Sequence, residues 1–540
     1  MRDRSVLTPG LPTRNDLFWV SLSLSVGLLV AFVYLITHPY PAYGAGLYLE
    51  ISEQILAHGY GFPETISHYT SRGVPFAYPP LMFYVNAFIL DSVPVDPIAL
   101  SRYLPVLLTV LYLIPYYFLA RELLEEAAAA GLATIILAMA SPTLQWHLSA
   151  GGLVRAMAFL LVLTGSYTGL RLFRSGNRQW LIPSTLLFGA TVLTHPIYTV
   201  FFGLTYVLFY LAFDHSLGGL VSGSIVAVGG IVLVSPWWYS VARRHGVDVF
   251  FAAAGTHSGL FGGLDRLFDQ FVYPLVTGYP TSIFFLLSFA GTFYFLGRQR
   301  LLLPTWLVTG AFVLGKARFQ FVAGSMMAGS FLVAVARNTL RDPSARAWKP
   351  TLHRALAVVF VFVIVVSLVS SAATLTSTDP TNRWQPQFID RSDETAMTWV
   401  SQNTAQSADF VVLGDAAEWF PLLADRTILI GPWGIEWEGP TRYNSQLSQY
   451  RTLSTCSSEQ CITRGLRDAD VRPNYLYVPK ESYTVRGESQ NGTVPLRQTL
   501  NRSNRYQVAY ENQGVTIYRV NLTARRDEPA PDSLTGTLPR

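Results

Sequence analysis

The chain has 540 residues, of which 50% are hydrophobic and only 14% carry a charge. Globular proteins average roughly 25% charged residues, so this composition excludes a purely soluble protein. The net charge is +5, yet residues 373–540 hold 17 of the 39 basic residues and 19 of the 34 acidic ones. The positive balance therefore belongs to the apolar part of the chain, and it does not indicate nucleic-acid binding.

Apolar segments follow one another from residue 17 to about residue 374, each of a length suited to crossing hydrocarbon as a helix. Segment 17–37 follows an arginine-containing stretch and lacks a small-residue cleavage site, so residues 1–16 are predicted to be a cytoplasmic N-terminus. The further candidates are 80–94, 98–119, 127–141, 152–170, 180–194, 196–213, 220–241, 275–296, 301–315, 319–336 and 355–373.

The positions of arginine decide how many of these segments cross. Arginine-rich loops at 171–178, 298–300 and 337–354 should all be cytoplasmic, because short cytoplasmic loops are enriched in Lys and Arg. Alternation through every candidate places them outside, whereas omitting segment 80–94, which opens with Pro80, places all three inside. We therefore predict about 11 crossings, with segment 80–94 re-entrant or packed against the bundle at its outer face.

This threading predicts a polytopic α-helical membrane bundle with an extracytoplasmic C-terminal domain. The transmembrane domain covers 17–373, with a first outer loop at 38–79, in a multi-pass protein of the cell membrane. Residues 374–524 have no spanning segment and alternate β-rich runs with one helical run, which is typical of a small α/β domain. Residues 525–540 have a composition typical of disorder. The predicted strands are 409–413, 427–430, 475–478, 506–510 and 515–520, and the predicted helix is 392–402.

Two further signals agree with an exterior C-terminal domain. Three acceptor sequences for N-glycosylation begin at Asn491, Asn501 and Asn521. The only two cysteines, Cys456 and Cys461, lie in the same domain, where an oxidising exterior favours a disulfide between them.

The most informative stretch is the first outer loop. Apolar residues recur there at helical spacing and stop at Gly59, which predicts a short amphipathic helix at the membrane surface with Glu50 and Glu53 on its other faces. An interfacial helix that only seals the bundle is one interpretation, and a helix that carries chemistry is the other. The apolar stripe consists of Leu47, Ile51, Ile55 and Leu56.

This loop resembles the first outer loop of the GT-C superfamily of membrane glycosyltransferases, which includes protein O-mannosyltransferases and the aminoarabinose transferase of lipid A. The resemblance implies transfer of a sugar from a polyprenyl or dolichyl phosphate to a glycan, lipid or protein acceptor at the outer face. Membrane lipids would be further partners. The matching positions are Tyr48, Glu50, Ile51, Ile55, His58, Gly59 and Pro79-Pro80-Leu81.

One departure from that family concerns the catalytic acid. This chain has Gly44 and Ala45 where those transferases carry an acidic residue, although the transfer needs a carboxylate to accept or orient the acceptor proton. Glu50 and Glu53 are the candidate substitutes, and Glu50 lies roughly 9 Å further along by helix rise. The alternatives are a carboxylate from elsewhere in the chain and a protein that has lost activity.

A lipid-linked phosphate also requires cations near the outer face. Lys316 and Arg318 are the first candidates, because they lie between two apolar segments that are joined with almost no loop. The alternative for each cation is contact with lipid headgroups. The others predicted on that side are Arg155, Arg243, Arg244 and Arg266.

Four more residues complete the predicted substrate-binding set. Tyr48 and His58 match the family pattern, and His147 and His195 fall at predicted outer ends of crossings. For either histidine, capping a helix is the alternative role. No His or Asp spacing predicts a metal site, so no metal ligand is assigned and use of a divalent cation stays open.

Two questions of function stay open at this stage. A noncatalytic or transport protein that binds lipid-linked glycans is the alternative to a transferase. In the C-terminal domain, segment 433–438 contains Trp433 and Trp437, which form either a platform for carbohydrate or a buried aromatic pair.

Overall fold

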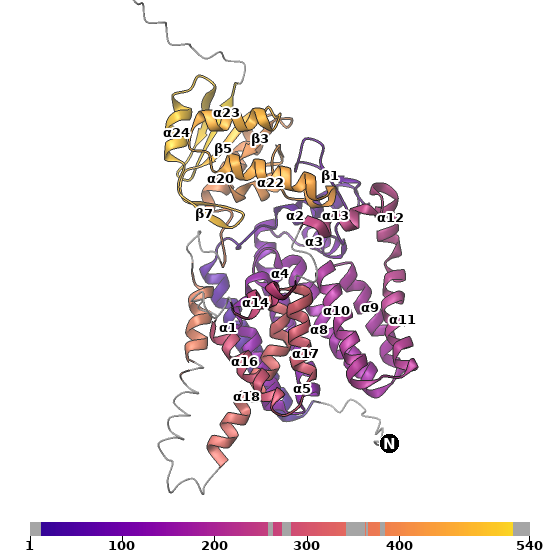
Figure 1. The fold of residues 1–540 in the computed structure, drawn as a ribbon. Coiled ribbons are helices and arrows are strands. Elements are labelled where there is room, and N and C mark those ends of the chain that lie inside the picture. Colours follow the sequence, from indigo (N-terminus) through magenta and orange to yellow (C-terminus); the bar gives the residue numbers. More distant parts are fainter. Residues whose placement is uncertain are drawn as a thin grey trace, which may run out of the picture.

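The computed structural model describes residues 12–256, 263–272, 282–341, 362, 365–377 and 384–521. A helical bundle is built from the chain up to α18, and a smaller domain of helices and a sheet sits on one end of it (Figure 1). The first outer loop lies between the two parts, so it is covered from both sides. The predicted tail, 525–540, lies outside the described residues, and so do residues 1–11.

The bundle agrees with the predicted helical membrane architecture. Within the described residues five helices are long and apolar enough to cross a membrane, or seven if two bent pairs each count as one span. Shorter apolar helices cover other predicted segments, so the number of 11 crossings stays a prediction. The helices are α1 (Arg14–Thr37), α4 (Pro97–Leu111), α5 (Leu113–Leu124), α6 (Ala127–Met139), α7 (Ser141–His147), α8 (Gly152–Ser175), η1 (Arg178–Trp180), α9 (Leu181–Val192), α10 (Pro196–Phe213), α11 (Leu217–Leu233), α12 (Ser235–His245), α13 (Asp248–Thr256), α14 (Gly263–Phe271), α16 (Ser282–Leu296), α17 (Leu302–Leu314) and α18 (Ala317–Arg341).

Proline explains both bends. Helices α6 and α7 meet at 58°, with Pro142 at the start of α7, and α11 and α12 meet at 56°, with Pro236 at the start of α12. Proline has no N–H for the preceding turn and its ring clashes with that turn, so a continuous helix breaks there. The first break turns α7 and its last residue, His147, into the bundle interior.

Ion pairs gather at the end of the bundle remote from the smaller domain. The acidic turn between α5 and α6 pairs with basic residues near the C-terminal ends of α8 and α18. The basic C-terminal part of α8 and Arg337 of α18 therefore lie at one end of the bundle, and the N-terminal ends of both helices lie at the other. The pairs are Arg171–Glu122 at 2.9 Å, Arg174–Glu125 at 2.6 Å and Arg337–Glu126 at 2.5 Å.

The outer loop contains the predicted helix. It is α2 (Gly46–Ala57), followed by the short antiparallel strands β1 (Thr65–Ile66) and β2 (Val74–Pro75) and by α3 (Leu81–Ser92). Leu47, Ile51 and Ile55 of the stripe are buried, Leu56 is half-buried, and Gly59 follows the helix with a φ of 59°. The predicted position of this helix at the membrane surface stays a prediction, and the structure shows that it packs against the smaller domain and that Glu50 is buried.

The smaller domain is the predicted mixed α/β region. One five-stranded sheet has the order β4-β3-β5-β9-β8, in which β3 runs parallel to β4 and β5, and β9 runs antiparallel to β5 and β8. All five predicted strands are in it. They are β3 (Asp409–Val412), β4 (Thr427–Ile428), β5 (Tyr475–Pro479), β8 (Tyr506–Glu511) and β9 (Val515–Val520), and a separate hairpin has β6 (Tyr483–Val485) and β7 (Glu488–Gln490).

Helices surround this sheet, and the predicted one is α20 (Arg391–Asn403), which begins with a capping box between Asp390 and Asp393. A disulfide joins Cys456 and Cys461 just before and within α23. The three glycosylation asparagines are exposed. The other helices are η3 (Asp415–Glu418), α21 (Phe420–Ala424), η4 (Ile435–Glu438), α22 (Pro440–Ser454), α23 (Glu459–Asp468) and α24 (Val494–Asn501).

Candidate functional site

The centre of the candidate site is a buried arginine. Arg318 is the second residue of α18 and follows a turn in which Gly315 has a φ of 57°. Its guanidinium carbon lies 5.4 Å from the centroid of the Tyr198 ring, and its Nε is buried without a hydrogen-bond partner in the described part of the chain. No described carboxylate forms an ion pair with it. A buried cation without a counter-ion is costly, so this arrangement favours binding of an anion.

A second arginine lies close to the first. Arg155, in the first turn of α8, is half-buried, interacts electrostatically with Arg318 and has its guanidinium carbon 5.2 Å from the Trp146 ring centroid. Gly151 leaves room for this side chain, since a Cβ there would overlap the guanidinium. Among described residues Arg155 has no ion pair either. Two neighbouring cations that repel one another raise the affinity for an anion between them.

A buried polar pair stands next to the arginines. His147, the last residue of α7, shares a hydrogen bond of 2.8 Å between its Nε2 and the Tyr198 hydroxyl. His195, the N-cap of α10, packs its ring edge-on against Tyr198 with centroids 5.1 Å apart. Of the predicted substrate-binding residues, the structure therefore brings Arg155, Arg318 and both bundle histidines together around one tyrosine.

Three helix N-termini meet at this cluster. Arg155, Tyr198 and Arg318 are the fourth, third and second residues of α8, α10 and α18. A helix N-terminus carries a partial positive charge and unpaired N–H groups, which favour an anion such as phosphate. The backbone therefore adds to the positive potential of the two guanidinium groups.

The smaller domain adds a carboxylate to this region. Glu418, the last residue of η3, is buried, and the Tyr69 hydroxyl donates a 2.6 Å hydrogen bond to its backbone oxygen. The pKa of the Glu418 carboxyl is raised to about 8, mainly by burial and further by Asp415, while the charges of Arg486 and, less strongly, Arg155 act in the opposite direction. Glu418 and the arginine cluster are thus in electrostatic contact.

Tyr48 connects the two sides of the site. It is half-buried on α2 and interacts electrostatically with Arg155 and Glu418. Burial raises the pKa of the Tyr48 hydroxyl above its ordinary value, so the group stays protonated and able to donate a hydrogen bond. Its ring lies 6.0 Å from that of Tyr78, whose hydroxyl donates to the carboxylate of Glu436.

Glu50 lies in a different environment. Its carboxylate accepts a 2.6 Å hydrogen bond from Gln54 and lies 3.4 Å from Nδ1 of His68. The nearby carboxylate of Glu50 raises the pKa of His68. The structure does not bring Glu50 together with Arg155 or Arg318, and its catalytic role stays a prediction.

Glu53, the other predicted catalytic residue, faces outward from α2. Its pKa is raised to about 7 by partial burial and by the nearby carboxylates of Glu50 and Asp425. Both of these carboxylates lie near His68. The role of Glu53 also stays a prediction.

The remaining predicted residues lie elsewhere. Arg244 donates a 3.0 Å hydrogen bond to the carbonyl of Phe62 and so holds the outer loop, while Arg243 beside it is exposed. His58 is exposed and bonds to the Gln54 carbonyl of its own helix at 2.6 Å. Lys316 is half-buried in the turn before α18. The side chain of Arg266 lies outside the described residues.

Two other features are less suited to the predicted chemistry. Trp433 and Trp437 are both buried, which does not fit an open carbohydrate platform, and they pack against different rings, Trp433 against Tyr450 and Trp437 against Tyr78. No group of three or more His, Cys, Asp or Glu side chains suited to a metal occurs among the described residues.

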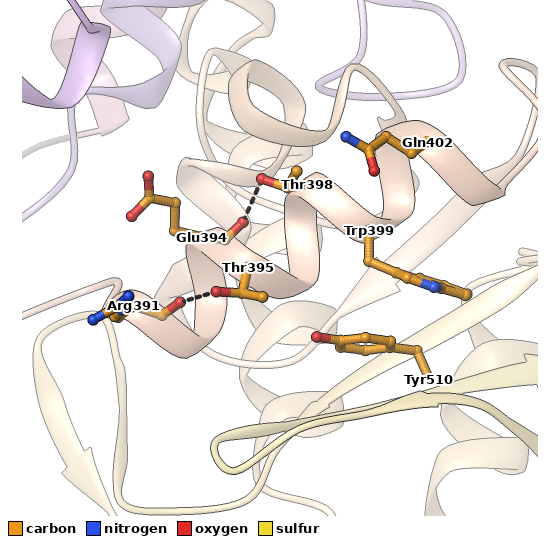
Figure 2. A pocket seen from close by; sticks show the side chains of 7 residues that line it. All are labelled: Arg391, Glu394, Thr395, Thr398, Trp399, Gln402 and Tyr510. Atoms are coloured by element: carbon orange, nitrogen blue, oxygen red, sulfur yellow. Dashed lines mark hydrogen bonds between the residues drawn. The ribbon is translucent and has the colours of Figure 1, made fainter.

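An open hollow of about 620 Å³ lies on the smaller domain, along α20, and Figure 2 shows the residues around it. Trp399 and Tyr510 stack there with centroids 4.8 Å apart. None of its lining residues belongs to the arginine cluster or its carboxylate. They are Arg391, Glu394, Thr395, Thr398, Trp399, Gln402 and Tyr510.

Sequence reasoning missed Glu418 and Tyr198. Glu418 ends the segment Asp415–Glu418, which follows a predicted strand and a glycine, and acidic residues in such a turn are a usable signal. Tyr69, which donates a hydrogen bond to the Glu418 backbone oxygen, is 349 residues away in the chain, so no local pattern links the two. Tyr198 comes two residues after Pro196 and reads as an ordinary aromatic residue at a membrane interface.

The fold has close counterparts among solved structures. A helical bundle with an outer loop and an α/β domain is similar, over nearly all of the length of this chain, to solved membrane glycosyltransferases. No family model and no curated protein matches the sequence.

Three solved structures illustrate the similarity. The archaeal oligosaccharyltransferase AglB from Archaeoglobus fulgidus, in complex with an inhibitory peptide and a dolichol-phosphate, is 14% identical with a TM-score of 0.55, and the match covers 94% of this chain and 75% of that one. ArnT from Cupriavidus metallidurans, bound to undecaprenyl phosphate, is 15% identical with a TM-score of 0.54, covering 94% and 98%. The arabinofuranosyltransferase AftD from Mycobacteria is 15% identical with a TM-score of 0.56, and the 96% of this chain that matches spans 40% of it.

Proposed function

We propose that the chain is an integral membrane glycosyltransferase that takes a sugar from a polyprenyl or dolichyl phosphate and transfers it to a glycan, lipid or protein acceptor. The observation that carries this proposal is the buried guanidinium of Arg318, which has no carboxylate partner in the described part of the chain and stands beside Arg155. The fold supports it, because two of the similar structures hold a dolichol-phosphate and an undecaprenyl phosphate.

The cationic cluster suits the leaving group of this reaction. When the bond between the sugar and the phosphate breaks, negative charge grows on the phosphate oxygens in a poorly hydrated place. Arg155 and Arg318 would neutralise that charge, and Tyr198 and His147 would donate or accept hydrogen bonds beside it. The convergent helix N-termini are fixed before the reaction begins, so they stabilise the charge without reorganisation.

The orientation and the domain limits form part of the proposal. The bundle, 17–373, would cross the membrane 11 times with a cytoplasmic N-terminus, and residues 374–524 would form the extracytoplasmic domain ahead of a disordered tail. The acidic turn that pairs with Arg171 and Arg337 would face the cytoplasm, in keeping with the enrichment of basic residues on that side. The arginine cluster would then work at the outer face.

A transfer assay tests the function directly. The purified chain in lipid nanodiscs is supplied with a panel of radiolabelled hexosyl and pentosyl dolichyl and undecaprenyl phosphates and with an extract of membrane lipids and glycans. We expect label to move to an acceptor, and Arg318→Ala to abolish the transfer. Arg244→Ala is the matched control, because Arg244 holds the outer loop at a distance from the cluster and should keep most of the activity.

The same assay separates the alternative function. Residues 44 and 45 are a glycine and an alanine, so neither supplies a carboxylate at the position where the GT-C transferases carry an acidic residue. This departure favours a protein that binds lipid-linked glycans without catalysing a transfer. That function is supported if the wild-type chain binds unlabelled dolichyl or undecaprenyl phosphate and transfers no label from any donor. If it neither binds these lipids nor transfers sugar, both functions are refuted.

A further inference from the structure

Gly44 of the outer loop lies directly against the carboxylate of Glu418 from the smaller domain. A Cβ at residue 44 would overlap both carboxylate oxygens of Glu418, so that carboxylate occupies the space that a side chain at residue 44 would fill. Gly46, at the start of α2, meets the backbone of Glu418 and Trp419 just as closely. The absence of two side chains from the outer loop therefore lets η3 of the smaller domain reach into the loop.

The Glu418 carboxylate has the environment of a reactive group rather than that of a structural one. Among the described residues no hydrogen bond or ion pair to its oxygens is formed, although the residue is only 9% exposed. A structural carboxylate at such depth normally has donors, as Asp415 has from the Tyr450 hydroxyl at 2.8 Å and the Gly487 N–H at 2.7 Å. Glu418 is thus free to accept a proton from a group that enters the site.

Electrostatic interactions connect Glu418 with the proposed donor site. Arg155 interacts electrostatically with Glu418 on one side and with Arg318 on the other. Asp415 of the same element faces Glu418, and the titratable groups of other elements that face it are Arg486, Arg155, Glu436, Tyr48, Tyr69 and Tyr450.

We propose that Glu418, contributed by the smaller domain, is the catalytic base of the transfer, and that Gly44 is required to admit it. The inference rests on the function proposed above. In the step, the acceptor oxygen or nitrogen forms a bond to the anomeric carbon, and the bond from that carbon to the phosphate oxygen breaks. The electron pair of the broken bond stays on the phosphate beside Arg155 and Arg318, and the acceptor proton moves to a carboxylate oxygen of Glu418.

Substitution of the base is the first test. With the donor and acceptor extract on which the wild type is active, Glu418→Gln should lower kcat about 100-fold to 10,000-fold, the usual contribution of a general base, with little change in KM for the donor. The kcat of the wild type should rise with pH through about 8, the raised pKa of Glu418, and the variant should lose that rise. Glu481→Gln, at an exposed carboxylate of the same domain, is the matched control and should keep the pH profile.

Glycine substitutions test the geometry independently. Gly44→Ala should displace the carboxylate and lower kcat at least tenfold, whereas Gly203→Ala should have no effect, because a Cβ at that helical position meets nothing within 4 Å. The double variant Gly44→Asp with Glu418→Ala returns a carboxylate to nearly the same place from the loop side, and it should recover activity that Glu418→Ala alone lacks. Retained binding of dolichyl phosphate shows that each variant is folded.

The outcomes distinguish this inference from the proposed function. If the wild type transfers sugar and Glu418→Gln keeps more than a third of its kcat, the assignment of the base is overturned and the transferase function stands. If the wild type transfers nothing, both fail. Loss of activity in Glu418→Gln without recovery in the double variant, and with an unchanged pH profile, also overturns it, because that result indicates a structural role.

Discussion

Replacing Arg318 with methionine should weaken binding of the lipid phosphate without destabilising the protein. The guanidinium is buried and has no carboxylate partner among the described residues, so its removal breaks no internal ion pair and leaves no charge without a partner. A hydrogen bond to a charged group contributes about 1.5–3 kcal/mol. One such bond to the phosphate corresponds to a change in Kd of roughly tenfold to 150-fold.

The stability of this variant should move in the opposite direction. Replacing buried charges by apolar residues of similar volume is often neutral or stabilising by about 1–4 kcal/mol, whereas breaking a buried ion pair costs about 3–5 kcal/mol. We therefore expect the unfolding temperature of Arg318→Met without lipid to equal or exceed that of the wild type. Added dolichyl phosphate should raise the unfolding temperature of the wild type by more than that of the variant.

Two measurements decide the matter: the Kd for dolichyl phosphate in nanodiscs and the unfolding temperature without added lipid. Arg244→Met is the control, since Arg244 donates to carbonyls of the outer loop and should leave the Kd unchanged. A variant Arg318→Met that binds the lipid like the wild type would refute the reasoning. So would a variant that loses stability as if a buried ion pair had been broken.

Three further predictions concern the smaller domain. The pKa of Asp393 is raised to about 7, mainly by burial, so the folded domain holds a proton that the unfolded chain releases near pH 4 and stability falls as the pH rises through this interval. Asp393→Asn keeps an acceptor for the 2.6 Å hydrogen bond from Tyr477 and should flatten this dependence in thermal unfolding at pH 5 and pH 8. Cys456→Ser removes the disulfide with Cys461, which is five residues further along the chain, and should lower the free energy of unfolding by about 2 kcal/mol. The measurement is denaturant unfolding under oxidising conditions, and an unchanged free energy would show that the bond does not form in the native protein. Arg426→Met removes the hydrogen-bond donors of four backbone carbonyls and should lower the free energy of unfolding by at least about 3 kcal/mol. A decrease below about 1 kcal/mol would show that these hydrogen bonds do not stabilise the domain.

The sequence predicts those parts of the fold that depend on local patterns. The helix α20 and the five strands of the sheet follow from hydrophobic periodicity, and α2 follows from its apolar stripe and from Gly59. The same pattern does not show what surrounds α2. Amphipathicity indicates that one face of a helix is covered, but it does not reveal that the smaller domain, which is distant in the chain, packs against α2 and that Glu50 is buried.

The sequence predicts the cationic part of the candidate site but not its carboxylate. The turn at Lys316 connects two apolar helices with almost no loop, which fixes Arg318 at a bundle end, and the structure agrees. Finding Arg155 next to it required helix packing, because nothing in the sequence relates the first turn of α8 to that of α18. The role of the Glu418 carboxylate could not be predicted from the sequence. Gly44 indicates only that a side chain is absent at residue 44, and the tertiary structure is needed to show that Glu418 occupies that space.

The contact at Gly44 also bears on how the two parts of the molecule work together. The outer loop and the smaller domain are joined by backbone hydrogen bonds, such as the 2.8 Å bond from the Tyr43 N–H to the Pro386 carbonyl, and by the 3.4 Å bond from the Trp419 indole to the Tyr43 carbonyl. On the mechanism proposed above, the bundle holds the phosphate and the smaller domain holds the base. Any motion that moves η3 away from α2 would then separate the base from the donor while the lipid stays bound. Docking of the smaller domain would therefore control the rate of the chemical step without changing the affinity for the donor.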